Sequence, residues 1–500
     1  MTLHVSNTLT GDREVFEPQD PEEVLLYVCG LTTSDPAHLG HARLWVAADV
    51  MHRWLEHEGY DVRHVENFTD VNEKIVARAG DPDLGDDEAA VASHYIQELL
   101  AEMRALNLKR AEVYPRVSEH VPEIVDLVET LVEKGYAYEA NGSVYFDVTS
   151  FEEYGKLSNQ QVEDIEEQGE PDELAEKRHP ADFALWKADG VSADAVREHR
   201  HDDHPHAGDG DADADLPSGQ TWESPWGEGR PGWHIECSAM SMTHLDSTID
   251  VHVGGQDLVF PHHENEIAQS EAATGERFAN YWLHVRLLQT KGEKMSSSLG
   301  NYWSVGDALD AVGGNVLRSF LVSTAYHNEA VYSEETLAEA EERFERLERG
   351  YETAVEACDS EAARTKVTDE ALRDAVASAR EDFAAGMNDD FNTRQAVTAL
   401  MDLTAAVNRH VDDRETYDYR ALHDAVDAYE ELGGDVLGFA FDATPDGDAE
   451  VAGEVVDLVL RVREAEREAG NYERADELRD ELVALGVEVQ DTDDGPTYRL

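Results

Sequence analysis

Two histidines and a glycine near the start of the chain could bind phosphate groups. His38-Leu39-Gly40-His41 follows an apolar run by nine residues and is expected to open a helix. A helix N-terminus offers unpaired N–H groups and the positive end of the helix dipole, which suit a phosphate. Gly40 lets a nucleotide approach the backbone, and His38 and His41 are expected on one helix face as donors to a phosphoryl oxygen. The alternative is that one histidine caps the helix and the other is solvated.

A second segment, Lys294-Met295-Ser296-Ser297-Ser298, contains a lysine next to hydroxyl groups. Such a group can clamp the phosphates of ATP during displacement at phosphorus. By itself the segment is also typical of a serine-rich turn, but its combination with H-x-G-H predicts an ATP site. We predict that His38, His41 and Lys294 are catalytic. The predicted ATP contacts are His38, Gly40, His41, Asp257, Lys294, Met295, Ser296, Ser297 and Ser298.

Four residues far apart in the chain have the side chains of a metal site. Cys29 ends the first apolar run, Cys237 lies about 200 residues later, and His262 and Glu266 are spaced i, i+4 on one helix face. Two thiolates, an imidazole and a carboxylate suit Zn²⁺. The alternative is that both cysteines are small buried apolar residues and that the helix face is solvated.

The elements that must position these residues alternate between strand and helix patterns. Apolar runs and amphipathic periodicity predict a strand at 24–29, a helix at 41–57 and a strand at 61–68, which make a βαβ unit. Further elements are predicted at 121–134 (helix), 136–138 and 144–146 (a hairpin around Asn141-Gly142), 249–253 (strand), from about 261 (helix) and 281–288 (strand). We therefore predict an α/β fold with a Rossmann-like parallel sheet, split by an insertion and followed by a C-terminal α-helical bundle.

The same patterns predict the domain boundaries. They are a Rossmann-like catalytic domain in two halves (1–117 and 230–300), a connective insertion (118–229) with an acidic loop (190–220), a linking helical region (301–332), a helical bundle (333–440), a linker (441–450) and a C-terminal helical subdomain (451–500).

The pairing of H-x-G-H with K-M-S-x-S resembles the nucleotide site of class I aminoacyl-tRNA synthetases. Further segments closely resemble the cysteinyl-tRNA synthetase family, here of a halophilic type. They are Val28-Cys29-Gly30, Asn67-Phe68-Thr69-Asp70, the segment 232–240 (GWHIECSAM), Gly254-Gly255-Gln256-Asp257-Leu258 and the segment 260–266 (FPHHENE). The resemblance extends from about residue 20 to the C-terminus, broken chiefly near 190–220.

The resemblance implies an enzyme that attaches L-cysteine to tRNA(Cys) in two steps. ATP-dependent formation of cysteinyl-adenylate releases pyrophosphate, and the cysteinyl group then passes to the 3′-terminal ribose of the tRNA. It implies one Zn²⁺ held by Cys29, Cys237, His262 and Glu266, Mg²⁺ with ATP, and Cys29, Thr69 and Trp233 at the substrate cysteine. The helical bundle is then the tRNA-binding part. For Asp257 the functional reading is a contact to the ribose of ATP, and the alternative is a solvated loop carboxylate.

A zinc ion would account for the selection of cysteine over serine. The two amino acids differ little in volume, so shape alone contributes about 1–3 kcal/mol. Zn²⁺ strongly prefers a thiolate and lowers the pKa of a bound thiol. Four protein ligands normally describe a closed structural site. The substrate thiolate must therefore be a fifth ligand or displace a weak one, for which Glu266 is the candidate.

Three features depart from the family pattern or add to it. Ser297 stands where the usual K-M-S-K-S motif has a second lysine, which removes one cation from the phosphate site. The segment 199–220 is rich in histidine and aspartate, and we interpret it as a solvated acidic loop, with a metal site as the alternative. Cys358 has no partner motif and is expected in buried structure.

The chain is strongly acidic: 109 acidic and 40 basic side chains give a formal net charge of −69. Only nine of the basic residues are lysines, and such a composition is typical of proteins that stay soluble in molar salt, where the Debye length is about 3 Å. By charge alone nucleic acid would be excluded as a partner, so a tRNA substrate requires local contacts. Three cysteines, no signal peptide and no long apolar run predict a cytoplasmic protein with no membrane partner, and a monomer is the working expectation.

Two rival functions stay open at this point. One is a ligase that joins cysteine to an amino sugar through the same adenylate chemistry. The other is a non-catalytic binding protein that keeps the fold. About 160 residues after the catalytic half favour tRNA over a sugar, and the intact H-x-G-H motif and metal ligands favour an enzyme.

Overall fold

The computed structural model describes residues 2–165, 174–201, 216–290, 293–294 and 303–441, and, further on, 456, 459–463, 474–475, 478–479, 482, 488–492 and 495–499. For Lys294 it describes the backbone. Met295, Ser296, Ser297 and Ser298, predicted as ATP contacts, lie outside these residues, as do residues 202–215 of the predicted acidic loop. The chain forms two compact units, residues 1–440 and 441–500.

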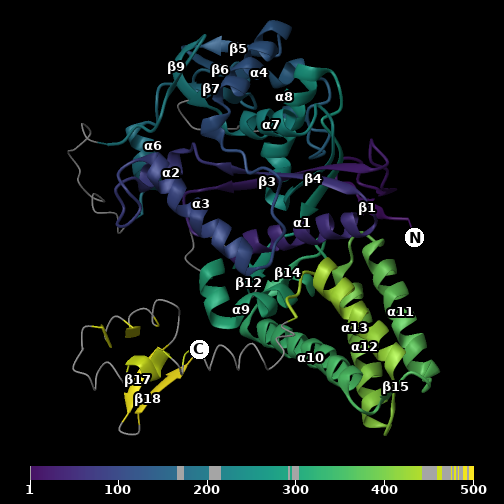
Figure 1. The fold of residues 1–500 in the computed structure, drawn as a ribbon. Helices are drawn as coiled ribbons and strands as arrows, with labels where there is room; N and C mark the ends of the chain where they lie inside the picture. The colour runs from purple at the N-terminus through teal and green to yellow at the C-terminus, as the bar shows by residue number, and fades with distance from the viewer. Residues whose placement is uncertain are drawn as a thin grey trace. The chain divides into compact units, whose positions relative to one another are not determined.

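The centre of the first unit is a parallel sheet whose halves lie far apart in the sequence (Figure 1). β3 (Glu23–Thr32) and β4 (Asp61–Thr69) are joined by α1 (Leu39–His57). β10 (Ile249–Gly255) and β11 (Ala279–Val285) return to the same sheet in the order β11-β10-β3-β4, and all neighbours are parallel. The predicted α/β fold with a split parallel sheet is confirmed.

The inner strand β3 contains a continuous apolar run because both faces of the sheet are covered. Leu26, Tyr27 and Val28 are fully buried. On one face α1 packs against β3, β4, β10 and β11. In an open parallel sheet, ligands bind beyond the carboxyl ends of the strands. Cys29 lies near that end of β3 and Thr69 is the last residue of β4, so the topology brings them together.

The connective insertion (118–229) contains more β-strands than the sequence predicted. It contains an antiparallel sheet of five strands in the order β5-β6-β7-β9-β8. The strands are β5 (Ala137–Ala140), β6 (Ser143–Phe146), β7 (Phe183–Ala188), β8 (Trp222–Ser224) and β9 (Gly227–Pro231). The predicted hairpin around Asn141-Gly142 is confirmed, and both turn residues have positive φ. No strand was predicted at β7 or at β8–β9, because strands this short give little periodicity.

Helices α4 (Val121–Lys134), α7 (Trp233–His244) and α8 (Glu264–Thr274) pack together beside this sheet. α7 touches β7 of the insertion and β4 of the parallel sheet. The helix expected from about residue 261 begins at Glu264, after a wide turn, η5 (Val259–His263). This turn and α7 carry residues of the predicted metal site.

The strand predicted at 281–288 is two strands. β11 ends at Val285, and β12 (Leu288–Thr290) belongs to a second, small sheet with β13 (Glu293–Lys294) and β14 (Ala330–Tyr332). The chain leaves the first sheet at Arg286, whose N–H donates to the carbonyl of Tyr326 at 2.8 Å. An apolar run does not show such an exit, because Leu287 and Leu288 continue the run beyond Arg286.

Helices dominate the rest of the first unit. They are α9 (Val305–Val322), α10 (Glu334–Asp359), α11 (Glu370–Met387), α12 (Thr393–Asp412) and α13 (Tyr419–Ala428), followed by the wide turn η7 (Tyr429–Val436). α10 to α13 form the bundle, with Ser333 capping α10. Shorter or flanking elements are β1 (His4–Ser6), β2 (Arg13–Val15), α2 (Glu73–Arg78), α3 (Glu88–Ala105), η1 (Val117–Glu119), η2 (Val148–Ser150), η3 (Val162–Asp164), α6 (Ala193–His199), η4 (Gln256–Leu258), β15 (Ala363–Arg364) and β16 (Tyr417–Asp418).

The second unit contains a β-hairpin in addition to helical residues. β17 (Glu488–Thr492) and β18 (Gly495–Arg499) pair in antiparallel register. The expectation of a wholly helical segment over 451–500 was therefore wrong at its end, where alternating Val489, Thr497 and Tyr498 favour strand. In the described part of the chain, no helix has the length and apolar character needed to cross a membrane.

Candidate functional site

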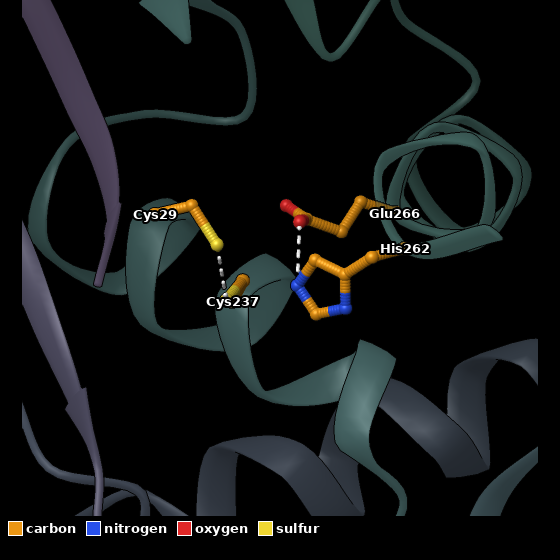
Figure 2. Close-up of side chains that lie close together, drawn as sticks. All are labelled: Cys29, Cys237, His262 and Glu266. Atoms are coloured by element: carbon orange, nitrogen blue, oxygen red, sulfur yellow. Dashed lines mark hydrogen bonds and ion pairs between the residues drawn. The ribbon is translucent and has the colours of Figure 1, made fainter. Parts of the chain in front are cut away.

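Cys29, Cys237, His262 and Glu266 converge in the structure (Figure 2). They come from β3, α7, the turn η5 and α8, and each is at most 4% exposed. One ligand atom from each residue lies within 4.8 Å of all the others. The four residues chosen from their types alone are therefore one buried cluster.

The spacing of these atoms fits a tetrahedral zinc ion. Two sulfurs bound at about 2.3 Å lie about 3.8 Å apart at the tetrahedral angle, and a nitrogen and an oxygen at about 2.0–2.1 Å lie about 3.3 Å apart. Cys29 Sγ and Cys237 Sγ are 3.8 Å apart, and His262 Nε2 and Glu266 Oε1 are 3.1 Å apart. Within the described residues, neither of the latter two buried atoms has the geometry of a hydrogen bond. They approach each other as two metal ligands would.

The charges of the cluster also call for a cation. The hydrogen bond with Cys29, and then burial, hold the pKa of the Cys237 thiol well above its ordinary value. Burial opposes a charge on His262, but its interactions with Cys237 and Glu266 outweigh burial and raise the pKa of His262 to about 10. A proton on His262 thus balances the Glu266 carboxylate. A divalent cation can replace that proton and those of the thiols, because metal ligands bind deprotonated.

Gly30 and Asn67 fix the strand that carries Cys29. A Cβ on Gly30 would lie 1.6 Å from the carbonyl oxygen of Asn67, so only glycine allows β3 to pass β4 at this distance. The side-chain oxygen of Asn67 accepts from the N–H of Gly30 and from the hydroxyl of Tyr27, each at 2.9 Å. The side chain of Asn67 therefore binds the residue two before Cys29 and the residue directly after it, where the pairing of β3 with β4 is irregular.

His38 and His41 lie side by side, but they are not two residues of one helix face. His38 is the N-cap of α1, and its Nδ1 accepts from the N–H of His41 at 3.3 Å. The Nδ1 of His41 accepts in return from the N–H of His38 at 3.2 Å. The two rings are stacked with centroids 3.6 Å apart. The helix-face prediction was wrong for His38, because capping side chains lie before the first turn.

The reciprocal cap sets the protons on both rings. Burial, and then the neighbouring His38, hold the pKa of His41 well below its ordinary value, so this ring is neutral. Because Nδ1 accepts a backbone N–H, the single proton of the neutral ring is on Nε2. Gly40 completes the arrangement, since a Cβ there would lie 2.8 Å from Cε1 of His38. The pair can thus present two N–H donors to a phosphate.

A cleft of about 420 Å³ connects the two predicted centres. Its lining includes Cys29, His38, Gly40, His41, Trp233 and Asp257. Trp233, 40% exposed, begins α7 and its ring lies 4.3 Å from that of His262. Asp257 lies in η4, at the end of β10. These predicted residues share one cavity with one member of the metal cluster.

Two other predicted residues have different positions. Thr69 is 3% exposed and is not among the residues lining the cleft. Its hydroxyl donates to Glu236 at 3.5 Å, and its carbonyl accepts from the N–H of Thr33. Lys294 lies in β13, where its backbone pairs with Gln289 of β12.

Comparison with known proteins agrees with these motifs. The family model for the class I (C) catalytic domain of tRNA synthetases matches residues 15–197 and 213–342. A DALR domain matches residues 382–442, and the cysteinyl-tRNA ligase anticodon binding domain matches 452–499. The cysteine--tRNA ligases of Haloarcula marismortui and Halobacterium salinarum are 70% and 67% identical to this chain, and each alignment covers both chains completely. The chain belongs to the cysteine--tRNA ligase family. It is a class I aminoacyl-tRNA synthetase.

Solved structures agree on the fold of this ligase. The methionyl-tRNA synthetase of Mycobacterium tuberculosis in complex with methionyl-adenylate has a TM-score of 0.59 at 16% identity, over 88% of this chain and 94% of the other.

The cysteine--tRNA ligase of Thermococcus onnurineus is 40% identical in sequence, over 100% of this chain and 99% of its own. The likeness therefore extends well beyond salt-adapted relatives.

Sequence reasoning missed the residues that orient the predicted metal ligands of this ligase. His252 Nε2 lies 3.0 Å from Glu266 Oε2, and His234 Nδ1 lies 3.0 Å from His262 Nδ1. His252 lies between two valines in β10, and a buried histidine in such a strand needs a partner, which is the signal by which it could have been found. His234 lies in α7 among other polar residues, so the sequence carries no such signal for it.

Proposed function

We propose that this ligase forms cysteinyl-adenylate from L-cysteine and ATP, and transfers the cysteinyl group to the 3′-terminal ribose of tRNA(Cys). The observation that carries the proposal is the single cleft that joins Cys29, at the metal cluster, to the capped pair His38 and His41. Such a cleft would hold the side chain of cysteine at one end and the phosphates of ATP at the other. The DALR and anticodon-binding matches favour tRNA over an amino sugar as acceptor.

We propose that Cys29, Cys237, His262 and Glu266 hold Zn²⁺ and that the metal selects cysteine. When bound, the metal would supply a site that prefers the thiolate of cysteine to the hydroxyl of serine. Trp233 lines the same cleft and would cover the substrate side chain. His252 and His234 contact Glu266 and His262, and they would orient these two ligands.

In the first step a carboxylate oxygen of cysteine attacks the α-phosphorus of ATP, and the bond to pyrophosphate breaks. The chain needs no nucleophile of its own, because positioning and charge stabilisation suffice. The Nε2–H groups of His38 and His41 would donate to the oxygens that gain charge. Lys294 would bind the departing pyrophosphate, with Mg²⁺, and Asp257 the ribose.

In the second step a terminal ribose hydroxyl of the tRNA attacks the carbonyl carbon of the adenylate, and AMP leaves. We propose that the helical bundle (333–440) and the C-terminal segment (451–500) bind the anticodon side of the tRNA. The support is the match of residues 382–442 to the DALR model and of residues 452–499 to the anticodon-binding model. We also propose a cytoplasmic location in a salt-accumulating cell, supported by the net charge of −69.

Cysteine-dependent ATP–pyrophosphate exchange, followed by charging of tRNA, tests the proposal. We expect exchange that is lost with a zinc chelator and restored by zinc, and then charging of tRNA(Cys). Exchange without charging would favour the amino-sugar ligase. An absence of exchange in the zinc-loaded protein at high salt would leave a non-catalytic binding protein.

A further inference from the structure

The predicted phosphate site of this chain has one cation fewer than the K-M-S-K-S motif supplies, because Ser297 stands in place of the second lysine. The described residues of the cleft offer two candidates for that charge, Lys74 and Arg286. Both side chains are exposed. We propose that Arg286 supplies the missing charge by binding the phosphates of ATP. This inference rests on the proposed adenylate-forming step.

The topology separates the two candidates. β4 and β11 are the opposite edges of the four-stranded sheet. Lys74 follows β4, at the edge of the sheet away from β11, whereas Arg286 follows β11 directly. β12 and its partner β13, which contains Lys294, come next in the chain. Arg286 is three residues from Gln289, opposite Lys294, so at most about 10 Å of extended chain separates it from that pair. It is therefore on the nucleotide side.

The backbone of Arg286 is held directly against the helix of the histidine motif. Arg43, two residues after His41 in α1 and 2% exposed, donates from Nε to the carbonyl of Arg286 at 3.0 Å. The N–H of Arg286 donates to the carbonyl of Tyr326 at 2.8 Å. These bonds fix the origin of the side chain relative to His38 and His41, while the guanidinium itself keeps its donors.

The guanidinium of Arg286 forms no ion pair within the described part of the chain. The contacts of Arg286 there involve only its backbone. The acidic residues that line the cleft are Asp35 and Asp257. Asp35 is already paired with Arg78 at 3.0 Å. Arg286 also borders an adjoining cavity of about 370 Å³, where Asp12 is the acidic residue of the lining, so its long side chain has room to move. An exposed cation in the same cleft as the histidine pair, in a chain of net charge −69, is suited to a phosphate.

The test is ATP–pyrophosphate exchange by the zinc-loaded full chain at constant high KCl, with variants at four positions. We expect Arg286→Gln to raise the KM for ATP about tenfold, without a matching rise in the KM for cysteine. Arg277→Gln is the matched control, since Arg277 is exposed just before the other end of β11. Ser297→Lys should lower the KM for ATP far more in the Arg286→Gln background than in the wild type, because it returns the lost cation.

Three results would each overturn the inference. The first is a KM for ATP in Arg286→Gln equal to that in Arg277→Gln, and the second is a raised KM for ATP in Lys74→Gln but not in Arg286→Gln. The third is an equal effect of Ser297→Lys on the KM for ATP in the wild type and in the Arg286→Gln background. Equal melting temperatures of the wild type and Arg286→Gln would exclude misfolding. Calorimetric titration with ATP decides the inference separately. If wild type shows no exchange, the proposed function fails, but weaker ATP binding by Arg286→Gln still supports this site.

Discussion

His38 and His41 cap the first helix reciprocally: each ring accepts the backbone N–H of the other residue through Nδ1, at 3.3 and 3.2 Å. The same two rings therefore have a structural role in the helix cap and a proposed chemical role as hydrogen-bond donors. It satisfies two backbone N–H groups that a helix N-terminus leaves unpaired. It also leaves the Nε2–H of both rings as donors, and the two roles can be separated by substitution.

His38→Asn should keep the cap and lose the donor, because asparagine is a good N-cap residue without an Nε2–H. We expect exchange activity to fall about 100-fold, in the range seen when one oxyanion donor is removed. The melting temperature should stay close to that of the wild type. His38→Ala should show the same loss of activity and a further loss of about 1 kcal/mol in unfolding free energy. Equal activity of His38→Asn and wild type would contradict the donor role.

Removal of one cysteine of the cluster should abolish metal binding and amino-acid selection. We expect Cys237→Ala to bind no zinc, whereas the wild type binds one equivalent per chain. The preference for cysteine over serine in exchange should fall to the 10–200-fold, roughly, that shape alone allows. Cys358→Ala is the control, because Cys358 lies outside the cluster. Metal analysis and competition between cysteine and serine provide the measurements, and unchanged selection in Cys237→Ala would refute the zinc proposal.

Burial of Glu66 predicts a pH-dependent stability. Glu66 is 5% exposed, and desolvation raises its pKa to about 8. An acid with a raised pKa binds more protons in the folded state than in the unfolded one, so its contribution to stability declines as the pH rises from about 4.3 to its folded pKa. Glu66→Gln should therefore gain in melting temperature relative to the wild type between pH 5 and pH 8. A difference that stays constant over this range would show that Glu66 does not titrate there.

The acidic surface predicts activity at high salt. At molar salt the Debye length is about 3 Å, which screens the repulsion between this chain and tRNA. Phosphate contacts also weaken at that ionic strength, so recognition should depend on shape, stacking and hydrogen bonds. We expect the rate of tRNA charging to rise when KCl is increased from about 0.1 M to the molar range. An optimum well below physiological salt would contradict this expectation.

Local patterns were sufficient wherever the chain itself sets the structure. The hairpin at Asn141-Gly142 and the helix Val121–Lys134 lie where the sequence placed them, because turn chemistry and helical periodicity are local. The exit at Arg286 was missed because its cause is a bond to Tyr326, 40 residues away. The cap of His38 was left as an alternative, because the same residue type suits a helix face and an N-cap.

The identity of the predicted metal ligands and of the H-x-G-H pair was readable from the sequence by itself. Residue type decides what a side chain can bind, and the order of strand patterns decides that the sheet is split. Only the tertiary structure decided that Cys29 and Cys237, 208 residues apart, bring their sulfurs to 3.8 Å. It alone also showed that Arg286 lines the same cleft as the histidine pair. Such distances depend on how helices pack onto sheets, and packing is a property of many distant residues at once.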